Sequence, residues 1–288
     1  MFPDKVVGDM GIVFCDLCPR GCGIGVGKTG ACGARGVLAG AENLVVSLSY
    51  GRVTSVALDP VEKKPLYHFH PGSKILSVGS FGCNLNCPWC QNHGISAAGA
   101  GEADTRHVAP DELAALAEEY VERGNIGVAF TYNEPLIGFE YVRDTSKILK
   151  ERGLKSVLVT NGYATSDYFN ELLSLIDAMN IDLKSINPEF YKRIGGDLDT
   201  VTRNIGAAAT RCHIELTCLL IEGENDDEGE MERMADFIAS VSPDIPFHIS
   251  RFFPRYHMTD RPPTDIGKMK RFEEIAGRRL KNVHLGNV

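Results

Sequence analysis

The 288-residue sequence is short of basic residues relative to acidic ones. Lys and Arg together number 30 against 38 Asp and Glu, which gives a net charge of −8 at neutral pH. Affinity for nucleic acids depends largely on clustered Lys and Arg, so this balance argues against a nucleic-acid partner.

Long apolar runs are also missing. No run approaches the length that spans a bilayer. The first residues, MFPDKVVGDMGIVF, carry no long apolar core behind a positive region, which a secretory leader would need. We therefore expect a cytoplasmic protein without a membrane partner.

Cysteine, in contrast, is abundant and unevenly distributed. Of the nine cysteines, four lie between residues 15 and 32 and three between 83 and 90, while Cys212 and Cys218 stand apart. Clustering of this kind favours metal ligation in a reducing compartment over a disulfide framework. We interpret Cys212 and Cys218 as buried, inert thiols.

After residue 73, short apolar β-type segments alternate with helical patterns, which is typical of βα units around a parallel sheet. The expected strands are Lys74–Ser80, Ile126–Thr131, Lys155–Thr160, Ala178–Leu183, Cys212–Ile221 and Pro246–Phe252. The expected helices are 110–124, 138–152, a segment within 166–176, 188–194 and 228–241. Six such strands predict an α/β fold, a partial (β/α)6 TIM-like barrel over residues 74–288, with the chemistry in the loops that follow the strands.

Residues 1–73 have a different character. Gly and Cys dominate the stretch from Cys15 to Gly36, and LVVSLSYGRVTSVALDP suggests a small hairpin with Gly51-Arg52 near its turn. We predict a small N-terminal cysteine-rich, metal-binding module over these residues.

The segment KKPLYHFHPG, Lys63–Gly72, joins the two parts and allows two interpretations. Its Lys63, Lys64, His68 and His70 could line the substrate side of the barrel mouth or bind an acidic partner. Alternatively, it is a solvated turn anchored by Tyr67 and Phe69, which we favour.

Cys83, Cys87 and Cys90 lie in the loop GCNLNCPWCQN, directly after the first expected strand. Three thiolates are one short of a tetrahedral zinc site or an ordinary cubane cluster. The cysteines could be buried small residues, or hold zinc with a borrowed ligand such as His93. A third interpretation is an iron–sulfur cluster with one iron left open for a substrate.

Four further cysteines, Cys15, Cys18, Cys22 and Cys32, supply a complete set of thiolates in a Gly-rich stretch that can wrap a metal. A structural zinc ion would stabilise the fold of a module that has only a small hydrophobic core of its own. An auxiliary [4Fe–4S] cluster would use the same ligands, and the spacing does not decide between them.

The C-x3-C-x2-C loop, with Trp89 before its last cysteine, resembles the radical S-adenosylmethionine (SAM) superfamily. The resemblance implies that the three thiolates hold a [4Fe–4S] cluster whose free iron binds the amino and carboxylate groups of SAM. It implies reductive cleavage of SAM to a 5'-deoxyadenosyl radical that abstracts hydrogen from a substrate, with the protein supplying binding and orientation. It also implies an external electron donor of the flavodoxin or ferredoxin type.

Later loops extend the resemblance. TYNEP matches the family's GGEP stretch, which binds the SAM ammonium, and it keeps Glu134 while Tyr132 and Asn133 replace two glycines. This implies that Glu134 lies beside SAM.

TNG and DLK resemble the glycyl-radical-activating branch of the family. The resemblance implies that Asn161, Asp182 and Lys184 meet the ribose hydroxyls and the methionyl carboxylate. His248 corresponds to a ribose or adenine neighbour.

The strings CDLCPRGC, GKTGACGARG and DPVEKKPLYHFHPG, together with the loops above, resemble the radical SAM enzymes of the AmmeMemoRadiSam system, often described as pyruvate formate-lyase activating enzyme-like. Members commonly continue into a C-terminal segment with another cysteine pair, which this chain lacks. The substrate, a small molecule or a protein, stays open. Other classes consistent with the cysteines are an iron–sulfur electron-transfer protein and a non-catalytic zinc-binding interaction module.

Overall fold

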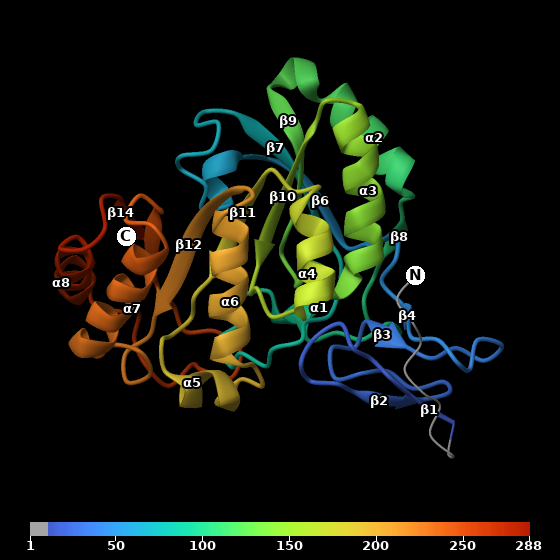
Figure 1. The fold of residues 1–288 in the computed structure, drawn as a ribbon, viewed down its shortest axis with the longest axis horizontal. Helices are drawn as coiled ribbons and strands as arrows, with labels where there is room; N and C mark the ends of the chain where they lie inside the picture. Colours follow the sequence, from blue (N-terminus) through green and yellow to red (C-terminus); the bar gives the residue numbers. More distant parts are fainter. Residues whose placement is uncertain (1–10) are drawn as a thin grey trace.

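A computed structural model describes residues 11–288, and an eight-stranded sheet organises them (Figure 1). Residues 1–10, which belong to the predicted N-terminal module and to the segment searched for a leader, lie outside the described residues. The strands in spatial order are β14 (Val283–Gly286), β13 (Phe247–Arg251), β12 (His213–Leu220), β11 (Ala178–Asp182), β10 (Lys155–Thr160), β9 (Asn125–Phe130), β7 (Lys74–Gly79) and β6 (Ser55–Pro60).

The sheet is mostly parallel. Each neighbouring pair from β7 to β14 is parallel, and β6 runs antiparallel to β7 at the edge. The central strands are buried on both faces, as expected for parallel strands covered by helices. The six predicted strands are all present, and β6 and β14 bring the sheet to eight.

Helices connect the parallel strands. They are α2 (Pro110–Glu119), α3 (Phe139–Glu151), α4 (Ser166–Leu173), α5 (Pro188–Arg193), α6 (Leu198–Ala209), α7 (Glu228–Val241) and α8 (Ile266–Ala276). Figure 1 shows α3, α4 and α6 side by side in front of the sheet, and contacts join α3 to β10 and α6 to β12. Among residues 11–288, no helix combines the length and the apolar character needed to cross a bilayer.

α6, α8 and β14 lie outside the elements predicted from the sequence. A signal for α6 was present, because Asp197 caps its first turn by accepting a hydrogen bond from the Thr200 N–H. Val201, Ile205 and Ala208 follow at spacings of four and three and are fully buried, which is the pattern of an amphipathic helix.

Short strands precede the sheet. β1 (Ile12–Phe14) pairs with β2 (Gly23–Gly25), and β3 (Arg35–Gly36) pairs with β4 (Val46–Ser47). Figure 1 shows these strands gathered near α1 (His93–Ser96), at the edge of the sheet where the strand-following loops lie.

The predicted hairpin around Gly51-Arg52 is wrong. The chain does turn at Gly51, with φ of 68°. However, β5 (Arg52–Val53) pairs with β8 (Arg106–His107), and β6 pairs with β7 over six residues. The six-residue ladder between β6 and β7 forms more backbone hydrogen bonds than a small local hairpin would. β6 therefore pairs with a strand that is more distant in the sequence.

Candidate active site

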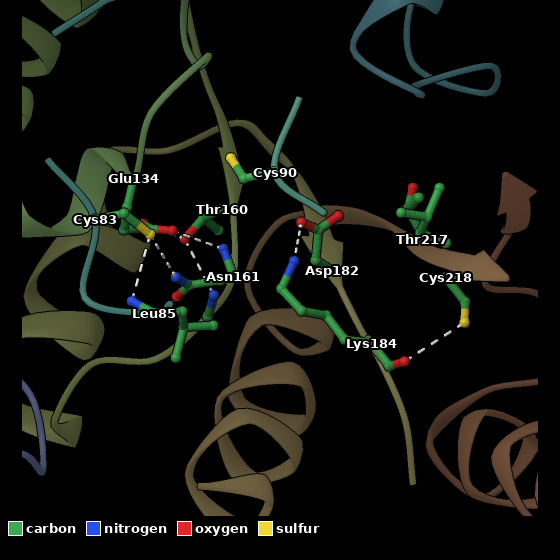
Figure 2. Close-up of polar contacts among 12 residues, drawn as sticks. Cys83, Leu85, Cys90, Glu134, Thr160, Asn161, Asp182, Lys184, Thr217 and Cys218 are labelled. Carbon is green, nitrogen blue, oxygen red and sulfur yellow. Dashed lines mark hydrogen bonds and ion pairs between the residues drawn. The ribbon is translucent and has the colours of Figure 1, made fainter. Parts of the chain in front are cut away.

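The loop after β7 brings Cys83, Cys87 and Cys90 to the wall of one cavity of about 300 Å³. The same cavity is lined by residues from the loops after the next three strands. Four of them are residues that the sequence predicted as cofactor contacts: Glu134, Asn161, Asp182 and Lys184. Figure 2 shows how these side chains converge from separate strands.

The cysteine loop is shaped by close packing at its first residue. Gly82 has φ of 84°, and a Cβ there would lie 2.4 Å from the Cys32 carbonyl oxygen, so this position requires glycine. The Leu85 N–H donates to the Cys83 sulfur at 3.4 Å, and the Asn161 amide donates to it at 3.7 Å. The loop therefore holds Cys83 in a fixed orientation.

Burial raises the pKa of the Cys83 thiol well above its usual value and that of Cys87 to about 11. Free thiols in these positions are therefore protonated at neutral pH. A bound metal would supply the positive charge that stabilises the thiolate form.

Glu134 is a buried carboxylate surrounded by donors. Its Oε1 accepts from the Thr160 hydroxyl at 2.6 Å and the Leu136 N–H at 2.9 Å, and its Oε2 accepts from the Asn161 N–H at 2.8 Å. Burial nevertheless raises the pKa of Glu134 to about 7, because these hydrogen bonds lower it by less. A cation entering the cavity would favour the ionised form.

Asp182 and Lys184, which flank the end of β11, form an ion pair of 2.7 Å on the opposite side of the cavity (Figure 2). Burial opposes the charge on Lys184, yet the paired carboxylate of Asp182 holds the pKa of this ammonium well above its usual value. The cavity thus presents a permanent cation close to the cysteines.

Tyr132 and Asn133 replace the two glycines of the family stretch. The side chains of both form hydrogen bonds to other segments of the chain. The Asn133 side chain accepts from the Ser80 N–H at 2.9 Å and donates to the Phe81 carbonyl at 3.0 Å. This ties the stretch to the backbone just before Cys83. Tyr132 adopts the left-handed conformation, with φ of 70°.

His248 does not line the cavity. It is buried lower in β13, where its Nε2 lies 2.6 Å from Oε2 of Glu215, whereas Ser250, two residues further along, reaches the cavity wall. The expected ribose or adenine contact is therefore not supported, because depth along a strand separates His248 from the site.

The segment Lys63–Gly72 packs against the same buried Glu215. This carboxylate accepts hydrogen bonds from the Tyr67 and His68 N–H groups at 3.0 and 2.7 Å. Phe69 is buried whereas Tyr67 is 37% exposed, so Phe69 is the deeper of the two expected anchors. The four basic residues of the segment are not among those that line the cysteine cavity.

The N-terminal cysteines gather in a second, smaller hollow. Cys15, Cys18, Cys22 and Cys32 line it together with Arg35, whose side chain is 5% exposed and pairs with Glu140. Burial raises the pKa values of Cys15 and Cys32 and takes that of Cys18 to about 11. In the described part of the chain, no group of three or more His, Cys, Asp or Glu side chains is arranged to hold a metal ion.

Asn92 and Thr160 are among the polar residues of the cavity wall that were not predicted as site residues. The Asn92 amide donates to the Tyr132 carbonyl at 2.7 Å, and Thr160 contacts Glu134. A signal existed for each: Asn92 follows the last cysteine by two residues, and Thr160 ends a predicted strand.

The sequence profile of the radical SAM superfamily matches residues 77–238. An uncharacterized protein of Methanocaldococcus jannaschii is 36% identical, and the match covers 100% of this chain and 84% of that protein. The pyruvate formate-lyase-activating enzyme of Clostridium pasteurianum is 27% identical over 56% of this chain and 67% of that enzyme. The crystal structure of a radical SAM methyltransferase from Sphaerobacter thermophilus shares the fold, with a TM-score of 0.54 and 17% identity over 75% of this chain and 67% of that one. From its profile match and its full-length relative, the chain belongs to the radical SAM superfamily.

Proposed function

We propose that this chain is an enzyme that cleaves SAM reductively, with Cys83, Cys87 and Cys90 as the ligands of its [4Fe–4S] cluster. The superfamily binds SAM and such a cluster, which supplies the electron that breaks a carbon–sulfur bond of SAM and starts radical chemistry. One observation carries the proposal: three cysteines share a single cavity with a buried acid and a half-buried ammonium from separate strands.

The residues present fit the cluster and SAM. Three sulfurs leave one iron free, and N–H donors already contact the Cys83 sulfur. Glu134 suits the SAM ammonium, while Lys184 suits its carboxylate through a charge-assisted hydrogen bond. Asp182 suits a ribose hydroxyl as an acceptor, and so does Oδ1 of Asn161, which accepts from the Tyr163 N–H and keeps a second lone pair.

We also propose that the sheet curves into a partial (β/α)6-type barrel. Support comes from the cavity wall, which includes residues from Cys83 after β7 to Ser250 on β13 and Asn287 after β14. A flat sheet would hold such distant strands too far apart to share one wall. Chemistry at the carboxyl ends of the strands agrees with such a barrel.

The N-terminal module, residues 1–73 in the sequence prediction, is proposed to hold a second metal centre, zinc or [4Fe–4S], on Cys15, Cys18, Cys22 and Cys32. The convergence of all four on one hollow supports this. Among residues 11–288, the buried Nε atom of Arg35 has no hydrogen-bond partner, so this lining residue offers a donor to sulfur acceptors.

For the substrate, we favour a group presented by a polypeptide, as in glycyl-radical activation, over an enclosed small molecule. A second opening adjoins the cysteine cavity and shares Cys83, Cys87 and Cys90 with it. Its wall includes the 29–33 loop and the 256–257 segment, so the site continues as a cleft along the surface. A low-potential electron donor of the flavodoxin or ferredoxin type is required, and the free thiols agree with a cytoplasmic location.

The proposal is tested by anaerobic reconstitution, reduction with dithionite and addition of SAM. We expect 5'-deoxyadenosine to form, and Cys87→Ala to abolish it together with the loss of about four iron atoms. Cys212→Ala is the matched control, since this thiol lines neither the cysteine cavity nor the hollow of the N-terminal cysteines. Full iron occupancy without any 5'-deoxyadenosine would reject the proposal, in favour of an electron-transfer protein if the iron cycles between redox states. Stoichiometric zinc without iron would favour the interaction module.

A further inference from the structure

Tyr132 occupies a backbone conformation that suits glycine. Its φ of 70° lies in the left-handed region, where a bulky residue with a Cβ is a genuine outlier. Such strain persists only where surrounding contacts over-determine it, and it concentrates at functional sites. Tyr132 lies between Thr131 and Asn133 on the wall of the cysteine cavity.

The Tyr132 side chain is anchored outside that cavity by an ion pair between buried Lys64 and partly buried Asp59. Its hydroxyl donates to Oδ2 of Asp59 at 2.9 Å, and Nζ of Lys64 lies 2.9 Å from the same oxygen. The Lys64 ammonium also lies 4.7 Å from the centre of the Tyr132 ring, in a cation–π arrangement. Two interactions therefore hold the tyrosine directly, and the ion pair joins its two partners.

The anchor has a persistent charge. Burial alone would raise the pKa of Asp59, but the hydrogen bonds from Lys64 and Tyr132 hold it well below its usual range. The side chain of Lys64 is 4% exposed, whereas that of its neighbour Lys63 is 67% exposed and lies 3.4 Å from Asp59. Lys64 is thus the structural partner, and Lys63 is a natural control.

On the cavity side, the same conformation fixes the backbone. The Tyr132 carbonyl accepts from the Asn92 amide at 2.7 Å, and the Thr131 carbonyl accepts from the Asn133 N–H at 2.9 Å. Each carbonyl oxygen has two lone pairs and therefore keeps one for a further donor. Glu134 comes directly after Asn133. A change at Tyr132 would therefore displace the two carbonyl oxygens relative to the Glu134 carboxylate.

We propose that Tyr132, Asp59 and Lys64 are positioning residues that hold the Thr131–Glu134 backbone in the conformation that receives the SAM ammonium. This inference rests on the proposed function. The contacts of the Tyr132 side chain thus stabilise a left-handed backbone conformation that glycine would adopt without strain.

The inference is tested by SAM binding to the full-length reconstituted protein, measured by anaerobic equilibrium dialysis. Tyr132→Ala should weaken SAM binding about tenfold, because the anchor is lost while the Cβ penalty stays. Tyr132→Gly should bind within about threefold of wild type, since glycine adopts the left-handed conformation freely. Iron content and the thermal midpoint are recorded for each variant, and Lys63→Ala should match wild type throughout.

A double-mutant cycle separates positioning from general stability. Asp59→Asn should weaken SAM binding in the wild-type background but have no further effect in Tyr132→Gly, because Asp59 acts through the tyrosine. Equal affinity of Tyr132→Ala and wild type would overturn the inference alone. So would a Tyr132→Gly protein as weak as Tyr132→Ala, which would show that the side chain itself is needed. Wild-type protein with full iron that binds no SAM would overturn the proposed function as well.

Discussion

The Thr160 hydroxyl lies 2.6 Å from Oε1 of Glu134, and this hydrogen bond joins the ends of two neighbouring parallel strands inside the cysteine cavity. This hydrogen bond restricts the Glu134 carboxylate to one orientation. The acid is consequently held in place before any ligand arrives, which lowers the entropy lost on binding.

Glu134 should impose a pH dependence on stability. Its pKa rises from 4.5 to about 7 on folding, which corresponds to about 3 kcal/mol. Between these pH values the folded state binds more protons than the unfolded state, so the contribution of Glu134 is fully present below pH 4.5 and is lost as the pH rises through 7. Thermal unfolding should show the stability of wild type falling relative to Glu134→Gln between pH 5.5 and 8. Parallel curves for the two proteins would contradict this.

Lys184 should recognise the carboxylate of SAM. Lys184→Met is expected to weaken SAM binding by about ten- to a hundredfold, the range for a hydrogen bond to a charged group. A decarboxylated SAM analogue provides the matched test, measured by the same dialysis. Wild type should bind the analogue less tightly than SAM, while Lys184→Met should not distinguish the two. If the variant kept the full preference for SAM, another residue would hold the carboxylate.

His248 should affect stability and leave SAM binding intact. His248→Gln weakens the contact with the buried carboxylate of Glu215 and is expected to cost about 1–3 kcal/mol of folding free energy. The dissociation constant for SAM should stay at the wild-type value in the folded variant. A tenfold weaker affinity at unchanged iron content would restore the cofactor role that the sequence suggested.

The N-terminal cysteines should bind metal independently of the cysteine loop. A Cys15→Ser, Cys18→Ser double variant should lose one zinc ion or about four iron atoms, and elemental analysis distinguishes the two. The Cys83→Ala, Cys87→Ala, Cys90→Ala triple variant is the complementary control and should retain that metal. Identical metal content in the double variant and wild type would refute a second centre.

The sequence predicted which loops would meet because parallel strands deliver their following loops to a common edge, and the family resemblance named the residues within them. Glu134, Asn161 and Lys184 each follow a predicted strand or lie at its end, and all three line the cavity. His248 could not be placed the same way, because alternation along a strand predicts the face of a side chain and not its depth. Its ring faces Glu215, 33 residues earlier in the chain.

Long-range pairings were the other limit. The partner of Tyr132 is Asp59, 73 residues away, and neither residue carries a local pattern that points to the other. To predict the ladder between β6 and β7, one would similarly need to know which of several apolar segments pairs with β7. Local periodicity contains no information about such competition.

Gly82 packs against the carbonyl oxygen of Cys32, so the first residue of the cysteine loop is shaped by a segment fifty positions earlier. A shortened protein that began after residue 40 would keep every strand of the large sheet but lose the surface that moulds this loop. Close packing therefore crosses the boundary that composition suggests between the two parts of the chain. Maturation of the loop should require that both parts are already assembled.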